Sequence, residues 1–173
     1  PWVRKSVAEL ERCEWYPFNR AIKAGAEVVM TAHVMFPALD QNCPATMSHT
    51  ILNGLLREQM GYTGVIVSDD MEMKAVRGRY PVELQMDRAV LAGVDAFLVC
   101  SKADLQAECV ESLIKLQEQS EQHEQMAEVS IQRLSKQMLT RHRHASIPLA
   151  KYQPTQWDRL CLEIERQSKS RLG

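Results

Sequence analysis

Residues Gly64 to Lys74 have the sequence GVIVSDDMEMK, which passes from a glycine through three aliphatic residues to two adjacent carboxylates, Asp69 and Asp70. The segment VIVS within it, Val65 to Ser68, is apolar, too short for a helix and rich in β-branched residues, so it predicts a strand. A strand that is apolar on both faces is typical of a parallel sheet covered by helices on both sides. Both carboxylates follow the end of this strand, where α/β sheets and barrels bind their ligands.

Similar strand signals lie before and after this segment. EVVMTA, from Glu27 to Ala32, predicts an earlier strand, and AFLVC, from Ala96 to Cys100, predicts a later one. The strands start near Val28, Val65 and Ala96, so the starts are 37 and 31 residues apart. These intervals are those of βα units with a helix between successive strands. The fold class predicted from the pattern is therefore α/β with parallel strands.

Helix signals fill the intervals between the strands. Ser6 and Glu9 have the spacing of a capping box, which predicts a helix through Trp15. A second helical piece, Pro17 to Ala24, ends at Gly25. The other predicted helices cover residues 49–60 (capped by Ser48), 81–92 (opened by Pro81 and closed by Gly93), 103–116 and 118–144.

The composition is that of a soluble globular protein. The chain has 173 residues, with 45% hydrophobic and 25% charged residues, which excludes disordered and fibrous classes. Its net charge of −1 gives no electrostatic argument for nucleic acid or membrane as a partner, and no apolar run approaches the roughly 18 to 20 residues of a membrane span. Five scattered cysteines without a CxxC pair favour reduced thiols in a cytoplasmic protein over disulfides or zinc. No cofactor is predicted.

Asp69 and Asp70 are the first candidates for chemistry. Successive residues of an extended chain point in opposite directions, so only one of the two carboxylates faces a given pocket. Two other interpretations stay open at this point: both carboxylates cap a following helix, Met71 to Val76, or the pair binds Mg²⁺. His33 follows the end of the preceding strand, so we expect it at the same rim as Asp69. Its role there is either structural or functional.

Residues Leu55 to Glu72, LLREQMGYTGVIVSDDME, resemble the active-site signature of glycoside hydrolase family 3. The signature contains an apolar pair, a basic residue, a polar residue, a spacer, glycine, three apolar residues, Ser or Thr, and the nucleophilic Asp. The matching positions are Leu55, Leu56, Arg57, Gln59, Gly64, Val65, Ile66, Val67, Ser68 and Asp69. Glu72 departs from the signature, which prefers a small or polar residue there. The segments AGAEVVMTAHVMFPALD and AVLAGVDAFLVC resemble strands six and eight of the β-N-acetylhexosaminidase branch of this family.

The resemblance implies a fold and an activity. By this resemblance, residues 1–145 are expected to form a partial TIM (β/α)8 barrel, about strands six to eight with their helices. Residues 146–173 have no counterpart in the family, and their own pattern predicts a C-terminal extension that is partly helical. The implied reaction is hydrolysis of terminal β-linked N-acetylglucosamine with retention of configuration, through a covalent glycosyl-enzyme on Asp69. A carboxylate in this role must stay ionised, so we expect hydrogen-bond donors around it.

The resemblance also implies the roles of neighbouring residues. Asp70 and Ser68 are expected to support the nucleophile from behind, with Asp70 holding the turn. His33 and Met30 are expected to line the pocket for the sugar. The expected partner is a carbohydrate with terminal N-acetylglucosamine, and in bacterial members of the branch it is derived from peptidoglycan during recycling.

One part of the family's machinery has no counterpart in the sequence. In this branch the general acid/base is a His backed by an Asp, within a Lys-His-Phe-Pro-Gly-His-Gly-like run after strand five, and the chain contains no such run. A complete barrel needs roughly 200 residues or more, and the chain begins at Pro1 without an initiator methionine. We therefore expect a fragment that lacks the N-terminal half of the barrel and is inactive alone. A non-catalytic α/β module in which Asp69 is structural, and an Mg-dependent enzyme with an Asp pair, are the alternatives.

Overall fold

The computed structural model of the protein describes residues 1–141. The chain divides into two compact units, Pro1–Thr140 and Arg141–Gly173, and the description below concerns the first of them. The predicted helical tail over residues 146–173 lies outside the described part. Within that part, no helix is both long enough and apolar enough to cross a membrane.

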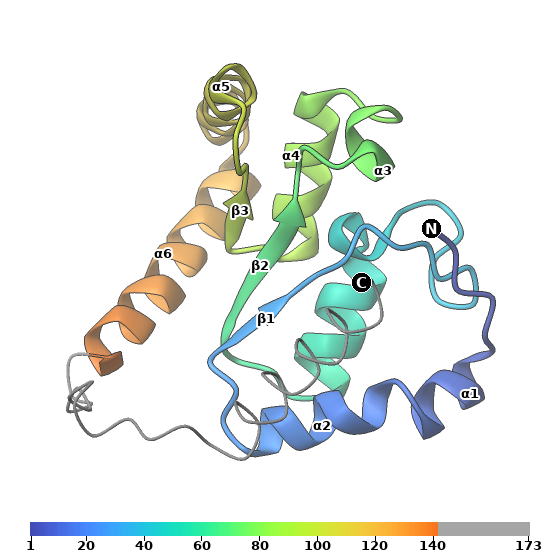
Figure 1. The fold of residues 1–173 in the computed structure, drawn as a ribbon. Coiled ribbons are helices and arrows are strands. Elements are labelled where there is room, and N and C mark those ends of the chain that lie inside the picture. Colours follow the sequence, from blue (N-terminus) through green and yellow to red (C-terminus); the bar gives the residue numbers. More distant parts are fainter. Residues whose placement is uncertain (142–173) are drawn as a thin grey trace, which may run out of the picture. The chain divides into compact units, whose positions relative to one another are not determined.

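Three parallel strands form the sheet in the order β1-β2-β3 (Figure 1). Their bounds are Val28–Met30 for β1, Val65–Asp70 for β2 and Ala96–Leu98 for β3. Val28 pairs with Val65, and Ala96 pairs with Val67. The α/β class, the parallel pairing and all three strand starts are confirmed. The central strand extends two residues further than predicted, so that both carboxylates lie within it.

Helices connect the strands. Their bounds are α1 (Val7–Arg12), α2 (Trp15–Lys23), the 3-10 turn η1 (Ala45–Met47), the π-helix η2 (Thr50–Gln59), α3 (Lys74–Arg77), α4 (Val82–Ala92), α5 (Ala103–Gln119) and α6 (Glu121–Arg141). Each helix predicted around the strands is present. The one predicted over residues 49–60 has the wider turns of a π-helix, with the Met60 N–H donating to the Leu55 carbonyl, five residues earlier.

Local sequence signals account for the helix ends. The capping box of α1 is confirmed: the Ser6 Oγ accepts from the Glu9 N–H at 3.4 Å, and the Glu9 carboxylate accepts from the Ser6 N–H at 2.8 Å. The α2 helix begins at Trp15, two residues earlier than predicted, because a proline is tolerated within a first turn. Gly93 ends α4 with φ of 101°, a left-handed conformation that glycine adopts without strain.

The core lies between one face of the sheet and the helices η2 and α4. Ile66, at the centre of β2, is completely buried there. It belongs to a cluster with Met47, Ile51, Leu52, Leu56, Tyr62, Val76, Ala89, Ala92 and Val94. A smaller cluster, made of Met71, Val82, Met86, Leu105 and Cys109, joins α4 to α5. Both clusters lie on the helix-covered side of the strands.

The other face of the sheet is open within the described part of the chain. Val28 and Met30 on β1 are 46% and 56% exposed, and Leu98 on β3 is 38% exposed. Figure 1 looks onto the strands with α4 behind β2. The prediction that helices cover the sheet on both sides is therefore wrong for residues 1–141. The outer edges of β1 and β3 also have no partner strand among these residues.

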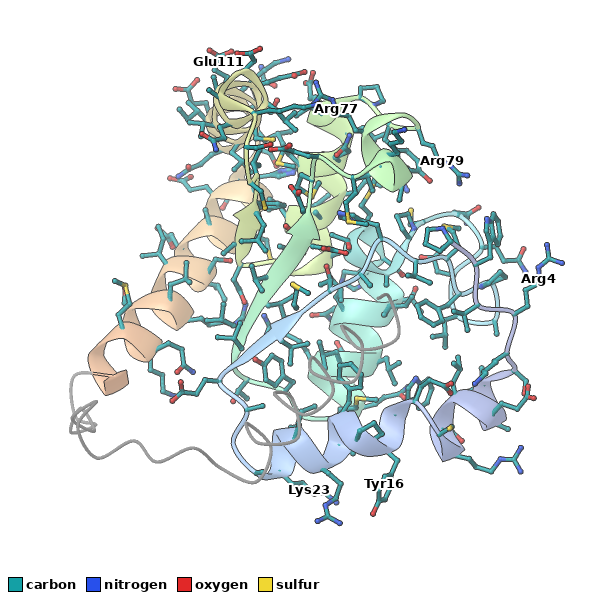
Figure 2. The ribbon with its side chains drawn as sticks, viewed as in Figure 1. Arg4, Tyr16, Lys23, Arg77, Arg79 and Glu111 are labelled. Atoms are coloured by element: carbon teal, nitrogen blue, oxygen red, sulfur yellow. The ribbon has the colours of Figure 1, made fainter. Side chains whose placement is uncertain are left out.

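Several charged side chains lie at the surface of the unit (Figure 2). Figure 2 labels Arg4, Lys23, Arg77, Arg79 and Glu111, and all of them are exposed. They come from loops and helices on different sides of the unit and carry both signs of charge. The labelled residues therefore form no patch of a single charge.

Candidate functional site

The carboxyl ends of the three strands meet at one rim of the sheet. Asp69 and Asp70 close β2, and the β1 and β3 ends lie on either side of them. The ladder between β2 and β3 is irregular between Val67 and Asp70. Such irregularities change the direction of a side chain and are common beside active sites. The residues given a role by the signature therefore lie where the strand departs from regular geometry.

Asp69 is half-buried and is held through both its backbone and its side chain. Its N–H donates to the hydroxyl of Thr31 at 3.3 Å, and its Oδ1 accepts from the Asp70 N–H at 2.8 Å. The expected donor to this carboxylate is thus present. None of the hydrogen bonds among residues 1–141 ends on its Oδ2. One carboxylate oxygen is therefore anchored, and the other is available to a ligand.

Thr31 connects the backbone of Asp69 to the loop after β1. It is buried, and its hydroxyl lies 2.8 Å from the hydroxyl of Thr46 in η1. Sequence analysis did not single out either threonine. The signal that could have found Thr31 is its place at the end of the apolar strand segment, next to the rim position of His33.

Asp70 contacts the backbone of the turn after β2, and its expected supporting role stays a prediction. Its Oδ1 accepts from the N–H of Glu72 at 3.1 Å and from the N–H of Cys100 at 3.4 Å. The alternative in which both carboxylates cap the next helix is wrong. Residues 71–73 form a turn, α3 begins only at Lys74, and the cap position of Met73 receives no side-chain hydrogen bond.

His33 lies beneath this turn and is only 3% exposed. Its Nε2 is 3.1 Å from the carbonyl oxygen of Asp70, and a carbonyl only accepts, so Nε2 carries the hydrogen. Burial lowers the pKa of His33 and so favours the neutral ring, whereas the hydrogen bond to the Asp70 carbonyl acts in the opposite direction. Its Nδ1 has no partner in the described structure. The geometry makes His33 a support for the turn, and its contact with a sugar stays a prediction.

Ser68 and Met30 differ in their exposure to solvent. Ser68 is completely buried, and its Oγ accepts from the Leu98 N–H at 2.9 Å, which ties β3 to β2 just behind Asp69. Met30 is exposed on the open face of the sheet. The place of Ser68 agrees with a supporting residue. The expected role of Met30 in a sugar pocket stays a prediction.

Glu72, the position that departs from the signature, reaches across to the loop after β3. Its Oε1 accepts from the N–H groups of Ser101 and Lys102, the latter at 2.7 Å, and its Oε2 accepts from the Ser101 hydroxyl at 2.7 Å. These hydrogen bonds, led by the Ser101 N–H, lower the pKa of Glu72 from its ordinary 4.5 to about 2. The carboxylate also faces the N-terminus of α5, where negative charge is favoured.

The pKa of Glu72 predicts a dependence of stability on pH. A depressed pKa means that the unfolded chain binds the proton more tightly, so this stabilisation is complete above pH 4.5 and is lost as the pH falls toward 2. The difference in melting temperature between the original protein and Glu72→Gln should be constant above pH 5 and shrink below it. Circular dichroism melts from pH 2 to 7 measure this difference. Parallel curves for the two proteins over the whole range would contradict the prediction.

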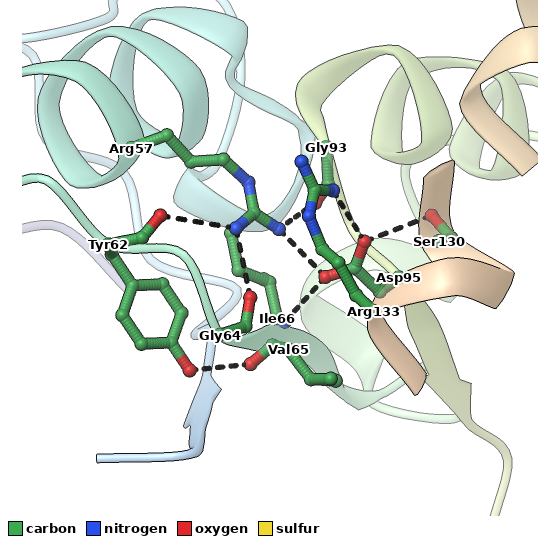
Figure 3. Close-up of polar contacts among 9 residues, drawn as sticks. All are labelled: Arg57, Tyr62, Gly64, Val65, Ile66, Gly93, Asp95, Ser130 and Arg133. Atoms are coloured by element: carbon green, nitrogen blue, oxygen red, sulfur yellow. Dashed lines mark hydrogen bonds and ion pairs between the residues drawn. The ribbon is translucent and has the colours of Figure 1, made fainter. Parts of the chain in front are cut away.

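A second polar cluster lies near the start of β2, away from the rim (Figure 3). The side chain of Asp95 is completely buried. Its Oδ2 accepts from Arg57 at 2.7 Å and from the Ile66 N–H at 2.8 Å. Its Oδ1 accepts from the Ser130 hydroxyl at 3.0 Å and from Arg133 at 2.8 Å. One carboxylate thus joins η2, β2 and α6.

Arg57 is the basic residue of the signature, and its contacts are structural. Its guanidinium donates to the carbonyl oxygens of Gly64 at 2.9 Å and of Tyr62 and Gly93 at 3.3 Å (Figure 3). These partners precede β2 and β3, whereas Asp69 lies at the far end of β2. The signature therefore contains two groups of residues: Arg57 fixes the start of the strand, and Asp69 occupies its end.

The described residues offer no evident metal site. No group of three or more His, Cys, Asp or Glu side chains within residues 1–141 has the geometry to hold a metal ion. Asp69 and Asp70 have no third ligand of this kind beside them in that part of the chain. The magnesium interpretation gains no support from the geometry.

Parallel βα units with polar side chains at the strand ends place the chain among the α/β domains that bind ligands at this rim. The chain belongs to one family of them: the model described as Glycosyl hydrolase family 3 N terminal domain matches residues 1–136. The family resemblance found in the signature is confirmed.

Relatives of known name agree with this assignment. The chain is 35% identical over 109 residues to the beta-hexosaminidase of Nitrosomonas eutropha, which covers 63% of this chain and 31% of the relative. It also resembles the glycoside hydrolase family 3 beta-N-acetylglucosaminidase of Paenibacillus sp. str. FPU-7, at 36% identity and a TM-score of 0.76, over 87% of this chain and 29% of that one. The beta-N-acetylglucosaminidase of Thermotoga maritima gives 31% identity and a TM-score of 0.76, over 80% and 31%. The chain spans about a third of the length of these relatives.

Proposed function

We propose that this chain is the nucleophile-bearing part of a retaining glycoside hydrolase that removes terminal β-linked N-acetylglucosamine. The observation that carries the proposal is the state of Asp69: it occupies the nucleophile position of the signature, lies at the strand-end rim and keeps Oδ2 free of hydrogen bonds within residues 1–141. The names of the relatives support the sugar, since they are hexosaminidases and N-acetylglucosaminidases.

The proposed reaction has two steps. In the first, Oδ2 of Asp69 forms a bond to the anomeric carbon while the bond to the aglycone oxygen breaks, and that oxygen takes a proton from a general acid. In the second step, the group that served as general acid acts as a base and removes a proton from water. The water oxygen then bonds to the anomeric carbon, and the bond to Asp69 breaks and releases its carboxylate. Two inversions at the same carbon retain the configuration.

The general acid of this proposal lies outside the chain. The histidine at the rim, His33, is buried, and its Nε2 is occupied by the carbonyl of Asp70, so it is poorly placed to reach a leaving group. We assign the three βα units to about strands six to eight of a barrel. The open face of the sheet, the free edges of β1 and β3 and the one-third coverage of the relatives support this assignment. The remaining strands would cover the face that Val28 and Met30 leave exposed.

We expect the isolated 173-residue chain to have negligible hexosaminidase activity. It supplies one of the two groups that a retaining enzyme needs, and loss of the acid/base alone costs about 10²- to 10⁴-fold. The release of nitrophenol from an aryl β-N-acetylglucosaminide measures the activity. Clear turnover that disappears in Asp69→Ala would refute this prediction and reveal an acid within the chain.

A chimera tests the proposed function itself. Residues 1–136 of this chain would replace the aligned segment of the Thermotoga maritima enzyme, which would supply the rest of the barrel. We expect the chimera to hydrolyse an aryl β-N-acetylglucosaminide in preference to the corresponding β-glucoside. A folded chimera without activity would contradict the proposal and favour a non-catalytic relative.

For the natural substrate and location we propose a peptidoglycan-derived sugar in the cytoplasm, in line with the bacterial relatives and with the unpaired cysteines of the described residues.

A further inference from the structure

The loops after β2 and β3 are joined at the rim by a set of hydrogen bonds to carboxylates. Asp70, the last residue of β2, and Glu72, in the loop that follows, provide the acceptors. Cys100, Ser101 and Lys102 come from the second loop and provide backbone N–H donors. Asp70 uses one oxygen for its contact, and Glu72 uses both of its oxygens. We call these five residues the rim clamp.

Glu72 has the stronger part of the rim clamp. From the loop after β3 it accepts three hydrogen bonds, two from backbone N–H groups and one from the Ser101 hydroxyl, whereas Asp70 accepts only one from that loop, a longer bond of 3.4 Å from the Cys100 N–H. Hydrogen bonds to an ionised carboxylate are about twice as strong as those between neutral groups. The Lys102 N–H lies just before α5, whose own cap position has no side-chain acceptor. Glu72 therefore provides, from another loop, the cap that α5 lacks.

The two sides of Asp69 are fixed by different means. On the β1 side, Thr31 accepts from the N–H of Asp69, and His33 donates to the carbonyl of Asp70. On the β3 side, the regular strand pairing is interrupted between Val67 and Asp70. The pairing resumes at Asp70 and Leu98, and the rim clamp follows this last pair, so it extends the connection to the loop after β3 beyond the ladder.

We propose that Glu72 is a positioning residue for Asp69: its contacts with Ser101 and Lys102 fix the turn that orients the nucleophile. This inference rests on the proposed function, because it assumes that Asp69 reacts. Glu72 does not touch the reacting atoms. Its effect passes through the turn of residues 70–72, where the Glu72 N–H binds Asp70 and the Asp70 N–H binds Asp69. A nucleophile must lie about 3 to 3.5 Å from the carbon that it attacks, and a misplacement of about 1 Å costs on the order of 100-fold in rate.

Kinetics in the chimera test this role. Glu72→Ala should lower kcat by about 10- to 100-fold while KM changes less than about twofold, since substrate contacts persist and the orientation of Asp69 is lost. Glu72→Gln keeps one acceptor oxygen and should fall between Ala and the original residue. Glu83→Gln is the matched control, because Glu83 also accepts a hydrogen bond at the surface, from Lys115, and neither residue belongs to the rim clamp. An unchanged kcat in Glu72→Ala, with Asp69→Asn inactive, would overturn the inference and leave the proposed function intact.

Amide hydrogen exchange in the 173-residue chain tests the role of Glu72 without a measurement of activity. We expect the N–H groups of Ser101, Lys102 and Asp70 to be protected, and Glu72→Ala to accelerate their exchange while amides in the core of α4 stay protected. Unprotected amides at Ser101 and Lys102 in the original chain would overturn the rim clamp. Faster exchange at these two amides with no change at Asp70 would show a cap for α5 only and would equally overturn the positioning role.

Discussion

Asp69→Asn should abolish hexosaminidase activity in the chimera, lowering kcat on the order of 10⁴-fold or more. An amide does not form the glycosyl ester that the proposed reaction requires. The substitution keeps the size of the side chain and keeps an oxygen that accepts from the Asp70 N–H. The melting temperature should therefore stay within about 2 °C of the original value, since no buried contact is removed. Steady-state kinetics and thermal unfolding measure the two quantities.

A complementary variant separates a lost nucleophile from a distorted site. Asp69→Ala leaves space beside the anomeric carbon, so added azide should restore turnover of an activated aryl glycoside and give a glycosyl azide of inverted configuration. If the Asp69→Asn variant retains activity, or if it loses much of its stability, Asp69 has a structural role. Failure of azide to restore Asp69→Ala, while the protein remains folded, would also count against the nucleophile role.

Asp95→Ala should be the most destabilising single substitution at a polar residue of the described chain, with a loss of about 3 to 5 kcal/mol in the free energy of unfolding. It removes the carboxylate partner of Arg57, whose side chain is 9% exposed, and leaves that buried charge with only carbonyl acceptors. It also leaves the Ile66 N–H without an acceptor. The contact with Arg133 contributes less, because that side chain is partly exposed to water. Urea unfolding followed by tryptophan fluorescence measures the loss.

The matched control for this substitution is Lys115→Ala, which removes the exposed ion pair with Glu83. Both side chains of that pair are about half exposed, so the change should be within about 0.5 kcal/mol. Since Asp95 also receives Ser130 from α6, exchange should accelerate along α6 in Asp95→Ala before it does in β2. Equal, small effects of the two substitutions would show that the buried cluster does not hold the fold together.

The order of the elements could be predicted from sequence because each depends on neighbouring residues. The strand starts at Val28, Val65 and Ala96 and the cap formed by Ser6 follow from local pattern. The open face of the sheet could not be predicted in this way. Apolar residues such as Met30 indicate that a face is suited to burial, but they do not identify the segment that covers it, and within residues 1–141 none does.

The residues of the candidate site also differ in whether local sequence pattern could predict them. Asp69 and Asp70 could be predicted because they directly follow an apolar strand, and the signature then distinguishes Asp69 as the nucleophile. Glu72 was noticed only as a departure, since its partners Ser101 and Lys102 lie 29 and 30 residues further along the chain. Such contacts depend on the register of two strands and on the shape of two loops, which no local pattern specifies. The hydroxyl of Thr31 was missed for the same reason.

The two polar clusters lie at opposite ends of β2, so stability and the proposed chemistry depend on different residues. This separation is useful for engineering. Arg57 and Asp95 hold the beginning of the strand, whereas Asp69 and its neighbours occupy the final residues. A library that varies the loops after β1 and β3 would leave the Arg57 and Asp95 contacts untouched. Selection for new sugar preferences could thus proceed without a matching search for stabilising changes, provided that Glu72 and its partners Ser101 and Lys102 are kept constant.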